Sequence, residues 1–408
     1  LKPMQRLLNG DVGSGKTAVA VLAAFDVALS SQQSAVLAPT EILARQHFET
    51  FKNLFAGAPE IQIGLLTREA RMVASGGQGE SVPKKEFEAM LRENMINIVI
   101  GTTALLEDWV SIPKLALTIV DEQHRFGVEQ REALKKKRAG KEEPHFLSMT
   151  ATPIPRSLAL VAYGDADISI LDELPPGRVP VKTKVVDRKA MFLRLGELLA
   201  QGERGYVVCP LIDPSDALGV KSVEEVSKEL RNRFSKIPIA TLHGRMKAEE
   251  KDEVMRALKT GEVRIVVSTT VVEVGVDVPE ATFIFIEGAE RFGLAELHQL
   301  RGRVGRGAKP GVCYLSPSTP GEGGSRLAIL ERENDGFRIS EYDLRFRGPG
   351  QLFGTAQSGY IPLFRVASLN DVALLEKGKE AAQKTLAAGE LTGALLLEIQ
   401  AVFSEQNV

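Results

Sequence analysis

Gly10-Asp11-Val12-Gly13-Ser14-Gly15-Lys16-Thr17 is the stretch that decides the fold, because its spacing is that of a phosphate-binding loop. An apolar run over Gln5–Asn9 precedes it and a helical pattern over Thr17–Leu29 follows, so the loop is expected to join a strand to a helix. Glycines in such a loop let backbone N–H groups surround phosphate oxygens, and the helix N-terminus adds partial positive charge. A chance glycine-rich turn is the alternative, but it would explain neither the full spacing nor the flanking elements.

This loop predicts binding of ATP together with Mg²⁺. The Lys16 ammonium can reach the β- and γ-phosphates, and the Thr17 hydroxyl can ligate the metal. The positions that we expect to hold the nucleotide are Gly10, Gly13, Ser14, Gly15, Lys16 and Thr17.

Composition describes an ordinary globular chain of 408 residues, 44% hydrophobic and 25% charged. The formal net charge is −2, so a surface for nucleic acid has to be a local basic patch. The two cysteines, Cys209 and Cys313, lie in apolar runs and are expected in the core, which fits a reducing bacterial cytoplasm. No apolar run approaches the ~18 residues of a membrane span, and no signal peptide is visible, so no membrane association is expected.

Up to residue 175, apolar runs alternate with helical patterns, which predicts βαβ units and a parallel sheet. The expected strands after the first are Ser34–Ala38, Ile96–Ile100, Leu115–Val120 and His145–Ser148, with a helix at Ile42–Phe55. Arg71–Pro83 contains Gly76-Gly77-Gln78-Gly79 and is expected to be a surface loop.

Leu174-Pro175-Pro176-Gly177 is the clearest linker, and a second α/β unit starts after it. Its expected strands are Tyr206–Cys209, Ile239–Leu242, Arg264–Ser268 and Thr282–Ile286, and its expected helices are Glu224–Phe234 and Lys247–Lys259. A smaller tail begins near Glu331 and ends in a helical stretch over Asp371–Phe403.

Two carboxylates follow the buried strand Leu115–Val120. Beside a phosphate-binding loop, Asp121 is expected to hold the Mg²⁺ shell, and Glu122 to orient or deprotonate the attacking water. Acids at a strand exit are common, so this interpretation depends on the loop.

Asp121-Glu122-Gln123-His124 and Met149-Thr150-Ala151-Thr152-Pro153 together resemble motifs II and III of the superfamily 2 helicases. Ala38-Pro39-Thr40-Glu41 and Gly101-Thr102-Thr103-Ala104 are similar to motifs Ia and Ib, which contact one nucleic-acid strand. For the second pair, turns that only cap a strand remain an open alternative. The resemblance implies two RecA-like domains that face each other across an ATP cleft, at residues 1–175 and 176–330.

The second α/β unit contains the remaining motifs of the helicase set. Val267-Ser268-Thr269-Thr270-Val271-Val272-Glu273-Val274-Gly275-Val276-Asp277 resembles motif V, and Gln299-Leu300-Arg301-Gly302-Arg303-Val304-Gly305-Arg306 resembles motif VI. Phosphoryl transfer spreads charge over the equatorial oxygens, and an arginine from a facing domain can neutralise it when the domains close. The resemblance implies that Arg303 and Arg306 play this part with Gln299, and that Gly275 and Asp277 lie near the sugar or the cleft.

The tail resembles the translocation motif shared by RecG helicases and the transcription-repair coupling factor. It reads Asp335-Gly336-Phe337, then Asp343-Leu344-Arg345-Phe346-Arg347-Gly348-Pro349-Gly350, then Gly354-Thr355-Ala356-Gln357-Ser358-Gly359. The resemblance implies a helical-hairpin module at 331–408 that passes domain closure to duplex DNA; a glycine-rich loop that packs the last helices is the alternative. The residues implied in DNA binding or coupling are Thr40, Gly101, Thr102, Thr150, Thr152, Thr269, Arg345, Arg347 and Gln357.

Three details favour the RecG family over the coupling factor: Gln123 in the second motif, the linker Asp172–Arg178, and Arg347-Gly348-Pro349-Gly350. The resemblance spans Arg6 to Val366. It implies an ATP-dependent translocase or helicase that remodels stalled forks and Holliday junctions in DNA repair and recombination. Branched or duplex DNA is the implied partner of a monomer, and single-strand-binding protein is a further candidate.

The chain also departs from the family. Neither the N-terminal wedge domain nor the glutamine motif that reads adenine upstream of the loop is present, and Thr103 stands where a histidine is expected. Position 1 is not Met, so we expect a piece of a longer protein. Two other functions stay open. One is a coupling-factor-like motor acting on RNA polymerase, which needs a polymerase-binding domain. The other is an ATP-gated DNA-binding module without turnover, against which the intact Lys16, Asp121, Glu122, Arg303 and Arg306 argue.

Overall fold

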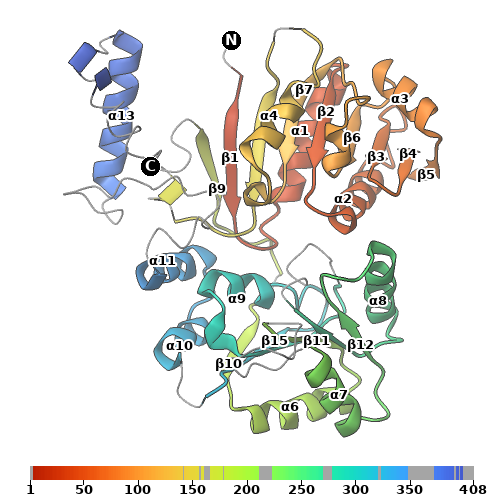
Figure 1. Ribbon diagram of the computed structural model, residues 1–408, viewed down its shortest axis with the longest axis vertical. Helices are drawn as coiled ribbons and strands as arrows, with labels where there is room; N and C mark the ends of the chain where they lie inside the picture. The colour runs from red at the N-terminus through yellow and green to blue at the C-terminus, as the bar shows by residue number, and fades with distance from the viewer. Residues whose placement is uncertain are drawn as a thin grey trace.

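The structure is a computed structural model, and it describes residues 3–140, 142–155, 158–159, 166–177, 179–210, 223–269, 278–319, 323–347, 372–389, 392–394 and 396–397. Two sheets dominate it, the first formed by the N-terminal half and the second by residues after the linker (Figure 1). None of the described helices is long and apolar enough to cross a membrane.

The first sheet has the strand order β5-β4-β3-β6-β2-β7-β8-β1-β9. Its strands are β1 (Gln5–Gly10), β2 (Gln33–Leu37), β3 (Ile63–Leu66), β4 (Arg71–Ser75), β5 (Gln78–Ser81), β6 (Ile98–Gly101), β7 (Leu115–Val120), β8 (His145–Thr150) and β9 (Asp167–Leu171). All neighbours from β3 to β9 pair in parallel, as the alternating pattern predicts.

Helices cover both faces of this sheet because successive residues of its buried strands point to opposite sides. On β2, Val36 packs in the core with α1 and α2, whereas Leu37 packs in the core with α3 and α4. The helices are α1 (Lys16–Leu29), α2 (Glu41–Leu54), α3 (Lys84–Arg92) and α4 (Val128–Lys135), with short 3₁₀ turns η1 (Thr103–Leu106) and η2 (Gln123–Arg125). The expected helices at Thr17–Leu29 and Ile42–Phe55 are thereby confirmed within two residues.

The loop expected over Arg71–Pro83 is wrong, because the segment forms the antiparallel hairpin β4–β5. Gly76 and Gly77 have φ of 55° and 81°, the left-handed conformation that a two-residue hairpin turn requires at both positions. These two glycines therefore indicate only the turn of the hairpin. The flanking strands carry few apolar residues, since only Val73 and Ala74 of β4 are buried.

The second sheet is entirely parallel, with the order β10-β15-β14-β11-β13-β12. Its strands are β10 (Lys182–Val185), β11 (Gly205–Val208), β12 (Ile239–Leu242), β13 (Ile265–Ser268), β14 (Phe283–Glu287) and β15 (Val312–Ser316). Its helices are α6 (Arg188–Ala200), α7 (Val223–Arg233), α8 (Ala248–Thr260), α9 (Leu294–Arg301) and α10 (Gly324–Arg332), with the turn η4 (Ala289–Arg291). Both cysteines are buried in its core, as expected, and burial raises the pKa of Cys313 to about 12.

Two tail helices follow: α11 (Gly336–Arg347), which packs on α9, and α13 (Val372–Ala388). In Figure 1 α13 stands beside β9 at the edge of the first sheet, where the Lys379 ammonium donates to the Ala166 carbonyl. The elements absent from the prediction are the strands β3, β9, β10 and β15 and the helices α3, α4, α6, α9 and α10. Their short or mixed patterns explain why periodicity alone did not reveal them.

Gly205 provides a test of how closely the second sheet is packed. A Cβ atom at this residue would lie 1.9 Å from the Phe283 carbonyl oxygen on β14. Gly205→Ala should therefore reduce the free energy of unfolding by about 3 kcal/mol or more, measured by thermal or urea unfolding. The control is Gly196→Ala in α6, where the nearest atom to a Cβ would be Phe234 Cε1 at 3.5 Å. Alanine should stabilise that helix by about 0.5–1 kcal/mol. Equal stability of the two variants would contradict the packing described.

Candidate nucleotide-binding site

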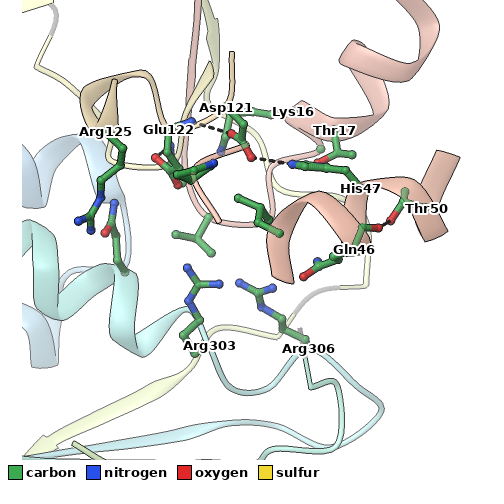
Figure 2. Close-up of a pocket in the computed structure, with 17 residues that line it drawn as sticks. Lys16, Thr17, Gln46, His47, Thr50, Asp121, Glu122, Arg125, Arg303 and Arg306 are labelled. Atoms are coloured by element: carbon green, nitrogen blue, oxygen red, sulfur yellow. Dashed lines mark hydrogen bonds and ion pairs between the residues drawn. The ribbon is translucent and has the colours of Figure 1, made fainter. Parts of the chain in front are cut away.

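A cavity of about 350 Å³ lies where the two halves of the chain meet (Figure 2). One wall comes from the carboxyl ends of β1, β2, β7 and β8, the edge at which open parallel sheets bind ligands. The other comes from α9 and the turn that follows it. Predicted site residues that line it are Gly13, Gly15, Lys16, Thr17, Asp121, Glu122, Gln299, Arg303 and Arg306.

The phosphate-binding loop joins β1 to α1, as predicted. Gly13 and Gly15 have φ of 75° and 95°, which turns their backbone in a way that side chains disfavour. Gly10 and Ser14 do not line the cavity but shape the loop, since a Cβ on Gly10 would lie 2.6 Å from Ser14 Oγ. That hydroxyl is buried, with no hydrogen-bond partner in the described part of the chain. Loops of this geometry direct backbone N–H groups toward a bound phosphate group.

Lys16 opens α1 and is only 9% exposed. Its ammonium donates to the carbonyl oxygens of Gly10 at 2.9 Å and Asp11 at 2.7 Å. Burial lowers the pKa of Lys16, while the nearby carboxylates, first those of Glu122 and Asp121, act in the opposite direction. The ammonium thus lies in a site where solvent screens the neighbouring charges only weakly.

Asp121 and Glu122 leave β7 at the same edge. The Asp121 carboxylate is 2.8 Å from His47 Nε2 and accepts the Glu122 N–H at 3.0 Å. Burial alone would raise the pKa of Asp121, but the hydrogen bond from His47 and the charge of Lys16 outweigh it and lower the pKa.

Glu122 occupies the left-handed region, with φ of 49°, which is uncommon for a residue other than glycine and typical of functional sites. Its carboxylate accepts the Ala151 N–H at 3.3 Å. Burial and then the neighbouring Asp121 raise the pKa of Glu122 to about 7. The two adjacent acids therefore have pKa values shifted in opposite directions.

Arg303 and Arg306 follow α9 and reach into the cavity from the opposite side to Lys16, Asp121 and Glu122 (Figure 2). Arg303 is 7% exposed, and the Arg306 Nε donates to the Gly302 carbonyl at 2.8 Å. The site therefore combines acids and an ammonium from the first half with guanidinium groups from the second.

Gln299 connects the two halves directly. Its side-chain amide donates to the Thr152 hydroxyl on the loop after β8. Thr150 supports that loop, because its hydroxyl accepts the Thr152 N–H at 3.3 Å. The structure thus brings the predicted residues of motifs III and VI into contact.

The other predicted DNA-contact residues that the structure describes do not line the cavity. Thr40 and Thr102 cap α2 and η1, where their hydroxyls accept the N–H groups of Leu43 at 3.3 Å and Ala104 at 3.5 Å. Gly101 ends β6, Thr269 is buried after β13, and Arg345 is exposed on α11. These hydroxyls cap helices, whereas the alternative left open for motifs Ia and Ib was a turn that caps a strand.

Some predicted residues lie outside the described part of the chain. They are Gly275, Asp277, Gln357 and the side chain of Arg347.

Four polar residues of the cavity were not predicted: Gln46, His47, Thr50 and Arg125. His47 belongs to the buried face of α2 with Leu43 and Phe51, so its pattern resembles that of a core residue. The signal that could have revealed His47 is its position, a polar residue on the apolar face of a helix. That helix follows β2, a strand whose carboxyl end borders the cavity.

Family profiles match the chain in three consecutive parts. The DEAD/DEAH box helicase profile matches residues 2–161, and the helicase conserved C-terminal domain profile matches residues 190–308. A profile described as ATP-dependent DNA helicase RecG, domain 3, C-terminal, matches residues 333–393.

Curated relatives extend the similarity over nearly the whole chain. The ATP-dependent DNA helicase RecG of Streptococcus pneumoniae is 45% identical over 93% of this chain and 55% of its own length. The Escherichia coli K12 protein of the same name is 45% identical over 90% of this chain and 52% of its own length. The chain therefore spans about half the length of these relatives.

Solved structures agree with the sequence comparison. A structure of RecG bound to a three-way DNA junction superposes with a TM-score of 0.71 at 40% identity, covering 92% of this chain and 48% of that one. A structure of the DEAD-box helicase Mss116 bound to single-stranded RNA matches at 16% identity with a TM-score of 0.61, which supports the two-domain RecA-like fold alone. With its profile matches in order and its relatives aligned over nine-tenths of its length, the chain belongs to the RecG family of ATP-dependent DNA helicases.

Proposed function

We propose that this chain is an ATP-hydrolysing motor that moves on duplex DNA and remodels branched DNA. The observation that carries the proposal is the single cavity in which Lys16, Asp121 and Glu122 face Arg303 and Arg306. Groups that bind phosphate and groups that neutralise a phosphoryl transition state thus come from opposite domains, so turnover and domain closure depend on each other.

The first domain binds and activates. The loop backbone and the Lys16 ammonium hold the β- and γ-phosphates, and Thr17 and Asp121 are the residues that would hold Mg²⁺. Bound there, the ion would offset phosphate charge. A pKa near neutrality suits Glu122 for accepting the proton of the attacking water, and the Ala151 N–H keeps its carboxylate oriented.

The second domain completes the site. Arg303 and Arg306 stabilise the charge that develops on the transferred phosphoryl group. The hydrogen bond from Gln299 to Thr152 links closure of the domains to the loop after β8. We assign residues 1–175 and 176–330 to the two motor domains, and 331–408 to the module that engages DNA. Loops at the carboxyl ends of β2, β6, β8 and β13 provide the remaining DNA contacts. Their residues are Thr40, Gly101, Thr102, Thr150, Thr152 and Thr269.

Branched DNA is the proposed substrate because a RecG relative has been solved on a three-way junction. From it we infer a role in DNA repair and recombination in the bacterial cytoplasm, as a monomer, with single-strand-binding protein as a candidate partner. The relatives named above carry the RecG name, which favours this function over a coupling-factor-like motor.

Lys16→Ala should reduce ATP turnover by about 10²-fold or more, because it removes the cation that faces developing phosphate charge. Phosphate release in the presence of fork DNA measures the effect. The matched control is Lys309→Ala, which removes a 65% exposed ammonium paired with Glu203 at 2.6 Å and should leave turnover at the wild-type rate. Unchanged turnover in Lys16→Ala would refute the assigned ATP site.

Arg303→Ala and Arg306→Ala should each lower kcat by about 10³-fold, the smaller end of the range for arginines supplied by a second domain, with a smaller change in KM. Steady-state kinetics with varied ATP separates the two constants. Arg194→Ala, on the exposed face of α6, is the control and should behave as wild type. A loss confined to KM would show that these arginines only bind nucleotide.

DNA specificity is tested by ATP turnover with a fork, a Holliday junction, linear duplex and no DNA. We expect the branched substrates to stimulate most. Their binding should weaken steeply between about 50 and 200 mM salt, because phosphate contacts release counterions. Turnover that does not respond to any of these DNAs would contradict the motor function, and an absence of turnover would favour an ATP-gated binding module.

A further inference from the structure

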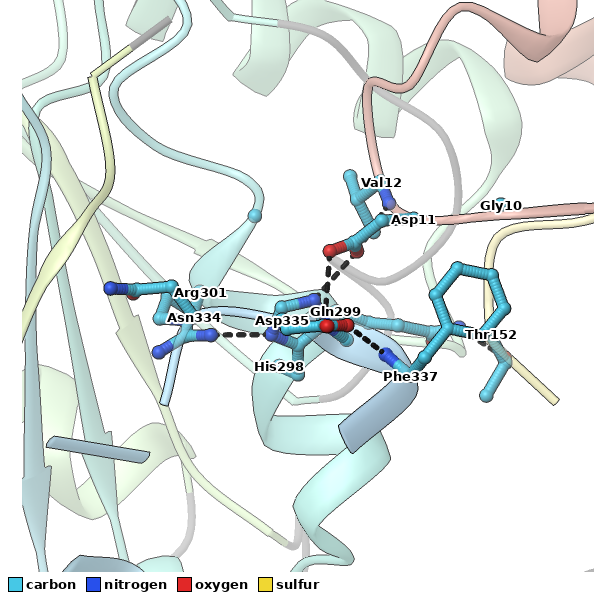
Figure 3. Close-up of polar contacts among 12 residues, drawn as sticks. Gly10, Asp11, Val12, Thr152, His298, Gln299, Arg301, Asn334, Asp335 and Phe337 are labelled. Atoms are coloured by element: carbon cyan, nitrogen blue, oxygen red, sulfur yellow. Dashed lines mark hydrogen bonds and ion pairs between the residues drawn. The ribbon is translucent and has the colours of Figure 1, made fainter. Parts of the chain in front are cut away.

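Asp11 belongs to the phosphate-binding loop, but its side chain turns away from the cavity and toward the second domain (Figure 3). Its Oδ1 lies 2.6 Å from His298 Nε2 on α9, and its Oδ2 accepts the N–H of Gly336 at 3.3 Å. Gly336 is the first residue of the tail helix α11. One carboxylate therefore joins three parts of the chain. They are the phosphate-binding loop that carries it, the helix α9 that precedes Arg303 and Arg306, and the tail helix α11.

The direction of the hydrogen bond to His298 can be deduced from its other partner. Arg301 Nη2 lies 2.6 Å from His298 Nδ1, and a guanidinium can only donate. Nδ1 must therefore accept, which leaves the proton on Nε2, where it is donated to Asp11. Arg301 is fixed in turn by the carbonyl oxygens of Leu330 and Glu333, each at 3.0 Å.

Burial would raise the pKa of Asp11, but the hydrogen bond from His298 and the N–H groups of Val12 and Gly336 outweigh it, and the pKa is lowered. The carboxylate is thus held ionised in a part-buried place. Its contacts are those of a charged acceptor, which are stronger than neutral hydrogen bonds.

Packing at the same point leaves no spare space. A Cβ atom on Gly336 would lie 2.7 Å from His298 Nε2, 2.7 Å from Pro153 Cγ and 2.8 Å from Asp11 Cγ. A Cβ on Gly302, at the end of α9, would lie 2.9 Å from Val12 Cγ1. The tip of the phosphate-binding loop therefore fits against α9 and α11 at two neighbouring places.

Helices α9 and α11 are also joined at a second point. The buried Asp343 carboxylate on α11 accepts the N–H groups of Leu294 at 2.9 Å and Ala295 at 3.3 Å, the first residues of α9. The first N–H groups of a helix have no partner within the helix, and the acidic side chain accepts hydrogen bonds from two of them. These hydrogen bonds attach α11 to the first turn of α9, so we expect the two helices to move together.

We propose that Asp11 is a positioning residue that couples the phosphate site to the tail helix α11, and so to DNA, an inference that rests on the proposed motor function. Its backbone carbonyl accepts from Lys16 Nζ, while its side chain holds His298 and Gly336. A nucleotide phosphate competes for the same ammonium protons, so binding and release act on the residue that carries the tail contact. The tail thereby senses the nucleotide through the loop as well as through the arginines.

Gly336→Ala tests this coupling without touching the cavity. We expect DNA-independent turnover and the KM for ATP to stay within about twofold of wild type, while stimulation by fork DNA falls about tenfold, within the usual span of coupling between sites. The matched control is Gly324→Ala in α10, where a Cβ would meet nothing within 4 Å, and which should keep full stimulation.

Asp11→Asn is the second variant, in case the added methyl of Gly336→Ala disturbs folding. An amide has one acceptor oxygen and cannot replace both carboxylate contacts, so stimulation should fall similarly. The double variant should lose no more stimulation than either single variant, since both remove the same contact. Full stimulation in both single variants, or additive losses in the double variant, would overturn the proposal. Wild-type protein without ATP turnover would instead overturn the motor function itself.

Discussion

A buried ammonium between two carboxylates and two guanidinium groups is the constraint on which the rest of the structure depends. Charges removed from water are costly unless they are paired or serve a charged ligand. Here Lys16 is balanced by Asp121 and Glu122 from its own domain, while Arg303 and Arg306 come from the other. Phosphate groups are the ligand that makes all five useful together, and the two sheets hold them at one point.

The domains meet through a few specific contacts near the loop. Gln299 reaches Thr152, His298 reaches Asp11, and Gly302 admits Val12. Two of these contacts are polar, as is typical of interfaces between domains that move relative to each other. Nucleotide charge within the cleft can then decide whether the domains are closed. The tail is attached at the same place, so its position follows theirs.

Much of the fold was predictable because buried parallel strands are continuous apolar runs. The strands β7 and β12 match their predicted bounds, and the loop with its flanking strand and helix was evident from its glycines. The β4–β5 hairpin was missed because its strands are short and largely polar, with only the Gly76-Gly77 turn as a signal. The tail helix α11 was expected only through its family motif, as part of a helical-hairpin module, because its mixed sequence gives no clear periodic pattern.

The candidate site shows the same limit. Motifs revealed residues that occur at a fixed sequence spacing because their chemistry requires it, such as Lys16 and Arg303. His47 was missed because its contact with Asp121 joins α2 to β7, a pairing that depends on the tertiary fold. The Asp11 contact with His298 is of the same kind, since 287 positions separate the two residues. No local pattern specifies such pairs, and only the packed domains bring them together.

We propose that nucleotide draws the two domains together around one shared site. The direct measurement is the distance between spin labels on Leu22→Cys in α1 and Leu193→Cys in α6, both exposed positions, while the native Cys209 and Cys313 are buried and remain unlabelled. With Mg²⁺ and a non-hydrolysable ATP analogue, the distance distribution should shorten and narrow, and this change should be absent when Lys16→Ala is added. An identical distribution with and without the analogue would contradict the account.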